Sequence, residues 1–190
     1  MKRYVKHHIP HHVRLLWLGL GLLHTLTIAA TVISPPDHIA AALPEAHLSG
    51  AGTYRWFGLR VYDAELWVGP RGYQENDAPF ALDLQYARSF SGRKIAERSA
   101  AEMEKLGLGS AEQRQAWQAQ MQACFPDVED GTHLTGVFLP GTGARYYRDG
   151  KAMCDIRDSQ FAAAFFAIWL DPRTSAKSLR ADLLGQTKAP

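Results

Sequence analysis

The sequence of 190 residues contains only two cysteines, Cys124 and Cys154, and it has no CxxC pair or Cys/His spacing of the kind that holds zinc. Both cysteines stand beside apolar residues, so a buried free thiol and a disulfide both remain open. An oxidising compartment would permit the disulfide. The sequence therefore predicts no metal site and no cofactor, and it leaves the state of the thiols undecided.

The main part of the chain also lacks an excess of positive charge. The formal net charge is +2, but the first thirty residues contain four basic residues and no acid. Taking these four from the 21 basic residues leaves 17 against 19 acidic residues, a net charge of −2. Phosphate binding needs a concentrated basic face. This charge balance argues against nucleic acid as a partner.

Common catalytic signatures are absent as well. There is no GxSxG nucleophile elbow and no HExxH zinc motif. The glycines of 141–143 lie in a tight turn with no helix after it, which does not fit a phosphate-binding loop. Beyond residue 30 the chain has only His38, His47 and His133. A histidine-based catalytic triad is therefore not expected.

The N-terminal segment has the pattern of an export signal. Residues 1–14 are basic and rich in histidine, residues 15–30 are almost wholly apolar, and Ser34-Pro35-Pro36 ends any helix. The alternative is an uncleaved membrane anchor, because residues 15–33 approach the roughly 20 residues that span a bilayer. We interpret residues 1–30 as a signal peptide or N-terminal anchor. The body is then exported, to the periplasm, and touches a membrane only through this segment.

The remaining chain is predicted to form a linker over residues 31–46 and one domain over residues 47–185. In residues 59–68, strand alternation places Tyr62, Ala64, Leu66 and Val68 on one face. Residues 80–86 show the cleanest alternation in the chain, typical of a half-buried antiparallel strand. Strands are predicted at 48–52, 59–68, 80–86, 133–139, 144–147 and 151–156.

Helices follow from capping residues and apolar stripes. Ser91 can cap a first helix, and Ser110-Ala111-Glu112-Gln113 matches a capping box that begins a second. Asp158 can cap a third. Helices are predicted at 91–107, 110–125, 158–170 and 174–185. The order of strands, two helices, a strand meander and two helices predicts an α+β fold, in which helices cover one face of an antiparallel sheet.

Two groups of charged residues are candidate sites. Asp63 and Glu65 share a strand face roughly 7 Å apart, where paired carboxylates can divide acid and base roles. The favoured interpretation is a solvent-facing rim, with an ion pair to Arg60 or Arg88. The charges of the first long helix are likewise predicted to form a solvated face. They are Arg93, Lys94, Glu97, Arg98, Glu104 and Lys105.

One stretch identifies a relative. The hairpin of residues 48–68 contains Gly50-x-Gly52, then Trp56-Phe57-Gly58-Leu59 and Val61-Tyr62-Asp63-Ala64. Further along come Leu84-x-Tyr86, Phe125-Pro126-Asp127-Val128 and Ile168-Trp169-Leu170. In order and spacing these motifs resemble the bacterial exported chalcone isomerase-like proteins, over roughly residues 43–184. The resemblance implies an open-faced β-sandwich of the chalcone isomerase type, with a large antiparallel sheet covered by helices.

The resemblance also implies a ligand. Plant members close a flavanone ring with an arginine and a threonine on the first two strands and a tyrosine and an asparagine on a helix. Non-catalytic members bind fatty acids through the arginine. Here Arg55 stands nearest to the arginine position, Asp63 replaces the threonine, and the helix positions fall near Ile95 and Glu102. We therefore expect no true chalcone isomerase activity.

The primary expectation is a domain that holds a small apolar or amphipathic ligand, such as a fatty acid, between sheet and helices. Arg55, Tyr62 and Asp63 would bind its polar end. The alternative is an isomerase, an intramolecular lyase acting on a small phenolic or enone substrate, with Asp63 as base and Arg55 stabilising an oxyanion. A structural or partner-binding envelope protein with a filled cleft is a third possibility.

Overall fold

A computed structural model describes residues 33–187, and the predicted signal or anchor of residues 1–30 lies outside the described residues. The described chain forms one six-stranded antiparallel sheet in the order β1-β2-β3-β4-β5-β6. The strands are β1 (His47–Trp56), β2 (Leu59–Val68), β3 (Phe80–Tyr86), β4 (His133–Leu139), β5 (Gly143–Arg148) and β6 (Lys151–Ile156). The helices are α1 (Asp37–Ala42), α2 (Gly92–Lys105), α3 (Ala111–Cys124), α4 (Ser159–Leu170) and α5 (Lys177–Leu183).

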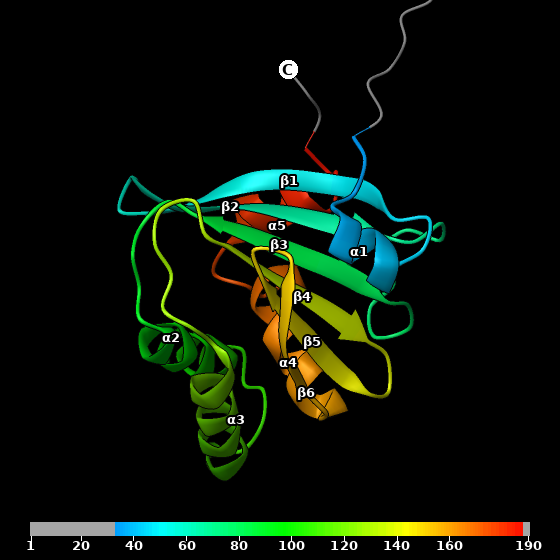
Figure 1. The fold of residues 1–190 in the computed structure, drawn as a ribbon. Coiled ribbons are helices and arrows are strands. Elements are labelled where there is room, and N and C mark those ends of the chain that lie inside the picture. The colour runs from blue at the N-terminus through cyan, green and yellow to red at the C-terminus, as the bar shows by residue number, and fades with distance from the viewer. Residues whose placement is uncertain (1–32, 188–190) are drawn as a thin grey trace, which may run out of the picture. The chain divides into compact units, whose positions relative to one another are not determined.

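The two faces of the sheet are covered differently. Helices α4 and α5 lie behind the strands in Figure 1, whereas the short α1 lies on the viewer's side. The larger apolar cluster contains residues of α2, α3, α4 and α5 together with alternate strand residues such as Leu66, Leu82 and Phe138. The smaller cluster contains Ile39 of α1 and lies on the other set of alternate residues. The predicted α+β architecture, a sheet covered by helices, is confirmed.

The helix starts follow the capping chemistry of the sequence. The Ser91 side chain accepts from the Lys94 backbone N–H at the start of α2. Ser110 and Gln113 form the complete capping box at the start of α3. The carboxylate of Asp158 accepts from two backbone N–H groups at the start of α4. These bonds satisfy donors that a helix leaves without partners, so local sequence alone was enough to position them.

The segment predicted as a linker is partly folded. Residues 37–42 form α1, and Ile39 is fully buried beside Trp67, Ala81 and Val137 on the outer face of the sheet. A helix of six residues shows too little periodicity to be recognised from sequence. The described residues belong to one compact unit, which contains the six strands, the five helices and both apolar clusters that the structure describes.

Cys124 at the end of α3 and Cys154 in β6 form a disulfide, and their Cα atoms are 5.9 Å apart. That separation lies in the normal range for disulfides. The bond ties the α3 helix to the edge strand of the sheet. Of the two states that the sequence left open, the structure has the disulfide.

Within residues 33–187, no helix is both long enough and apolar enough to cross a membrane.

Candidate functional site

A cavity of about 330 Å³ lies between the helix-covered face of the sheet and helices α2 and α4. This volume falls in the range of small-molecule sites. Its walls are mainly aromatic and aliphatic side chains, from strands β1 to β6, from both helices and from the segment after α4. Phe165, Phe166 and Trp169 of α4 form one wall, so the aromatic helix packs in the core and also encloses the cavity.

Three tyrosines from adjacent strands line the cavity. The register pairs Tyr54 with Tyr62 and Tyr62 with Tyr86, and their ring centroids are 5.1 Å and 5.7 Å apart. The Tyr62 hydroxyl accepts a hydrogen bond of 2.9 Å from Trp169 Nε1, which leaves its own O–H able to donate. Burial raises the pKa of Tyr62 and of Tyr86 well above the ordinary value for tyrosine. Both are therefore neutral hydrogen-bond donors at physiological pH.

Helix α2 contributes charged groups to the cavity wall. Lys94, Arg98 and Glu102 recur every four residues, so they share the helix face that borders the cavity. The guanidinium of Arg98 lies 2.6 Å from the Glu102 carboxylate, which also accepts from Lys105 at 2.9 Å and from Ser175 at 3.0 Å.

Glu102 remains ionised although it is only 6% exposed. Burial raises its pKa, but hydrogen bonds from Lys105 and Ser175 and the charge of Arg98 outweigh this, and the pKa lies below its ordinary value. Among the residues that line the cavity, Glu102 is the one carboxylate, against the two cations Lys94 and Arg98. The charged residues of the lining therefore carry a net charge of +1.

Tyr146 of β5 is another buried polar residue of the lining, only 3% exposed. Among the residues that the structure describes, no group forms a hydrogen bond with its hydroxyl. Its ring packs edge-on against Phe125 and Phe165, with centroid distances of 5.0 Å and 5.5 Å. Burial raises its pKa well above the ordinary value. An unpaired buried hydroxyl costs folding free energy.

Of the three residues predicted to bind a ligand, the structure places only Tyr62 in the cavity lining. Neither Arg55 nor Asp63 is part of it. Successive strand residues point to opposite faces, so Asp63 points away from the face that carries Tyr62. Arg55 is exposed, next to a register shift between Tyr54 and Arg55. Ligand binding by these residues stays a prediction.

Asp63 instead belongs to a polar rim, as the favoured interpretation predicted. Its carboxylate accepts a 2.6 Å hydrogen bond from Thr53 and an ion-paired contact from Arg60. Partial burial raises its pKa, but the bonds from Thr53 and Arg60 outweigh that, so the pKa lies below the ordinary value. Arg88 donates to the Arg60 carbonyl at 3.1 Å and completes the rim.

The cavity cations Lys94 and Arg98 were missed, because the sequence predicted a solvated helix face for them. One feature of the sequence did indicate that this helix borders the cavity. The family's helix positions, carried over to Ile95 and Glu102, both line the cavity. A helical wheel shows which residues share a face, but only the docking of α2 on the sheet reveals which face borders the cavity.

A second polar cluster lies on the outer face of the sheet. Asp83 is 4% exposed, and its carboxylate accepts a 2.6 Å hydrogen bond from Thr135 and contacts His133 Nδ1 at 2.6 Å. His38 of α1 reaches Thr135 at 2.8 Å. These bonds connect α1 to strands β3 and β4. The residues of 33–187 form no group of three His, Cys, Asp or Glu able to hold a metal ion.

Comparison with known proteins agrees with this geometry. The model of the chalcone isomerase-like family matches residues 29–185. An uncharacterized protein of Haemophilus influenzae is 34% identical over 151 residues, which make up 78% of this chain and 74% of that protein.

A solved structure shares the fold. The crystal structure of an Arabidopsis thaliana fatty-acid binding protein has a TM-score of 0.58 at 12% identity, over 75% of this chain and 88% of that chain. At this identity the similarity concerns the fold alone. The family match covers nearly the whole described domain and agrees with the motifs of the hairpin and of α4. The chain belongs to the chalcone isomerase-like family.

Proposed function

We propose that this protein is an exported chalcone isomerase-like domain that holds a small amphipathic molecule, such as a fatty acid, and does not isomerise chalcones. The observation that carries the proposal is the cavity of about 330 Å³, walled by apolar side chains and bordered by the cations of α2. An apolar site with a few placed polar groups is typical of small-molecule binding. The fatty-acid binding protein of the same fold supports this ligand class.

The charged groups suggest how the ligand lies. An anionic head group would pair with Lys94 and Arg98 on α2 and accept a hydrogen bond from the Tyr62 hydroxyl, on which the charge of Arg98 acts. Charge-assisted hydrogen bonds of this kind are about twice as strong as neutral ones. The chain of the ligand would extend along the aromatic wall of α4.

The placement of Asp63 supports a binding role over catalysis. As a general base, Asp63 would have to reach the substrate. It lies outside the cavity lining and is held by Thr53 and Arg60. Its lowered pKa also makes it a weaker base. Turnover of a chalcone by the unaltered protein would overturn this part of the proposal.

Export rests on the sequence of residues 1–30, and the disulfide is consistent with an oxidising compartment. Mass spectrometry of the protein recovered from a periplasmic extract would test it. The expected mature N-terminus follows residue 29 or 30, or lies within residues 40–42. An intact N-terminus in the membrane fraction would instead establish the anchor.

Ligand binding is tested with residues 33–190, which form one compact unit. Native mass spectrometry should detect a co-purifying amphipathic molecule, and delipidated protein should bind medium- and long-chain fatty acids in a titration. Lys94→Gln and Arg98→Gln should each weaken binding roughly tenfold, because each removes a charged donor.

Arg93→Gln is the matched control. Arg93 lies on the same helix, but it pairs with Glu97 and is not part of the cavity lining. Its affinity should stay within about twofold of wild type, since exposed ion pairs contribute little. If neither a co-purified ligand nor fatty-acid binding is found, the cavity is not a binding site and the filled-cleft alternative is favoured.

A further inference from the structure

The tip of the β1–β2 hairpin exposes three large apolar side chains together. Trp56, Phe57 and Leu59 are 55%, 86% and 50% exposed, and they are three of the four large apolar residues exposed among residues 33–187. Single exposed apolar residues are ordinary on a protein surface. A contiguous group at one turn marks an interaction site.

The backbone of this turn is strained at its aromatic residue. Phe57 and Gly58 both have positive φ, 47° and 78°, as in a two-residue hairpin turn in which asparagine or glycine is usual. A bulky residue with positive φ is uncommon and strained. Folding alone does not require an aromatic here, because the Phe57 side chain is the most exposed of the group.

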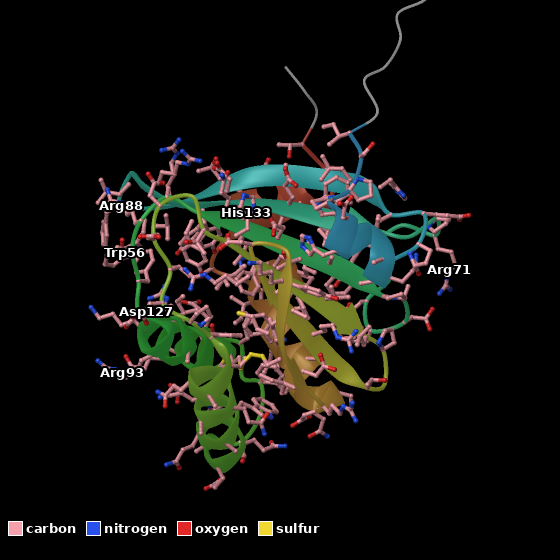
Figure 2. The ribbon with its side chains drawn as sticks, viewed as in Figure 1. Trp56, Arg71, Arg88, Arg93, Asp127 and His133 are labelled. Carbon is pink, nitrogen blue, oxygen red and sulfur yellow. A yellow bond between two sulfur atoms is a disulfide. The ribbon has the colours of Figure 1, made fainter. Side chains whose placement is uncertain are left out.

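Arginines flank the apolar tip. Arg55 and Arg60 bracket it on the two strands, and Arg88 joins them through its bond to the Arg60 carbonyl. Figure 2 shows Trp56 and Arg88 at one end of the molecule and Arg71 at the other. Asp63 offsets one arginine, and Glu129 and Asp130 follow on the nearby loop before β4. With one of the three arginines offset by Asp63, the tip itself carries a net charge of +2.

The tip is continuous with the cavity. Trp56 is both an exposed residue of the hairpin and part of the cavity lining, together with Lys94 and Arg98. A surface that binds the tip would therefore meet the border of the cavity. Tryptophan and phenylalanine favour the interface between lipid head groups and acyl chains, and arginine is attracted to anionic head groups.

From this combination we infer that the β1–β2 hairpin docks the domain on the surface of an anionic phospholipid bilayer. Trp56, Phe57 and Leu59 enter the interface, while Arg55, Arg60 and Arg88 contact the head groups. The border of the cavity then faces the lipid. If the proposed function holds, this orientation lets an amphipathic ligand pass between bilayer and cavity.

The test uses residues 33–190 and vesicles of phosphatidylcholine with or without phosphatidylglycerol. This segment has four tryptophans, of which Trp67, Trp117 and Trp169 are buried. A blue shift of the emission on adding vesicles therefore reports Trp56. The protein should co-sediment with the anionic vesicles, and bind the neutral ones several-fold less.

Variants locate the surface. Phe57→Ser combined with Leu59→Ser should lower vesicle binding about tenfold. Arg55→Gln should lower it about two- to fivefold, and Arg71→Gln at the opposite end should leave it unchanged. Fluorescence of the variants in the absence of vesicles checks that the fold is intact.

The docking test does not require a cavity ligand, so its failure is distinct from failure of fatty-acid binding. Absence of binding to either vesicle would overturn the inference. Equal loss with Arg71→Gln would overturn it as well, since it would indicate general charge attraction. A concentration-dependent dimer that Phe57→Ser abolishes would assign the tip to a second copy of the chain instead.

Discussion

The two faces of the sheet differ in what they bury. The inner face packs aromatic and aliphatic side chains against four helices and still encloses a cavity, with one tyrosine hydroxyl that has no hydrogen-bond partner within residues 33–187. The outer face is covered by a helix of six residues, yet its buried carboxylate has two hydrogen-bonding partners.

The contrast indicates a division of roles. On the outer face, satisfied polar groups specify one position for α1, because a displaced α1 would break the bond between His38 and Thr135. On the inner face, imperfect packing leaves room that a ligand can occupy. A folded protein closes most of its voids, so the cavity of about 330 Å³ on the better-covered face is the feature on which the proposed function rests.

The largest expected change in the free energy of unfolding comes from a substitution on the outer face. Asp83→Ala removes the acceptor shared by Thr135 and His133, and it should lower the free energy of unfolding by about 2–4 kcal/mol. Urea denaturation of residues 33–190 measures this. Asp83→Asn keeps one acceptor and should cost less.

Asp77→Ala is the control for Asp83→Ala, because Asp77 forms an exposed pair with Arg71 and should contribute under about 1 kcal/mol. Fatty-acid affinity of Asp83→Ala should be unchanged wherever the variant is folded. Loss of that affinity would contradict the separation of the two faces.

A substitution on the inner face should change the free energy of unfolding by a smaller amount and in the opposite direction. Tyr146→Phe removes a buried hydroxyl without a partner and should stabilise the ligand-free protein by about 1 kcal/mol. Thermal or urea unfolding with and without ligand measures it. Tyr147→Phe, on the neighbouring residue of the outer face, is the control. Destabilisation by Tyr146→Phe would mean that the hydroxyl is satisfied in solution.

The smallest expected effect is the contribution of His38 to the pH dependence of stability. Burial lowers the pKa of His38 below its ordinary 6.5, against the opposing charges of Asp83 and Asp37 and with a smaller contribution from His133. The unfolded chain therefore takes up this proton first as the pH falls. The stabilisation that comes from neutral His38 is fully present above about pH 6.5, and it is lost as the pH falls toward the lowered pKa.

Unfolding measured from about pH 7.5 to pH 5 should show this loss in the wild type and less of it in His38→Gln. His47→Gln, on an exposed histidine, serves as the control. Asp63 and Glu102 also have lowered pKa values, but their losses begin at lower pH, because carboxylates titrate near pH 4. If the free energy of unfolding of His38→Gln falls with pH as steeply as that of the wild type, His38 does not cause the pH dependence.

Much of the fold could be predicted because its signals are local. The alternation in residues 80–86 and the caps at Ser91, Ser110 and Asp158 depend on neighbours in sequence. The small helix α1 could not be predicted, since the burial of Ile39 and the bond between His38 and Thr135 are both contacts with strands distant in the chain.

The site was predicted less well. The family resemblance directed attention to the first hairpin, and Tyr62 there does line the cavity. Strand alternation places Asp63 on the face opposite Tyr62, although the resemblance assigned both residues to the ligand. The register shift beside Arg55, the docking of α2 that brings Arg98 to the cavity, and the burial of Asp83 under α1 all depend on contacts distant in sequence.

The sequence by itself determined the strands and the four longer helices, their order, the family resemblance and an ion pair of Asp63 with Arg60 or Arg88, of which the structure has Arg60. Short-range periodicity and capping carry that information, because they depend on residues a few positions apart. Only the tertiary structure decided that a cavity exists, which helix charges border it and that Trp56 connects it to the exposed hairpin tip. These features arise where elements from distant parts of the chain pack together, and no local pattern records the space that they leave.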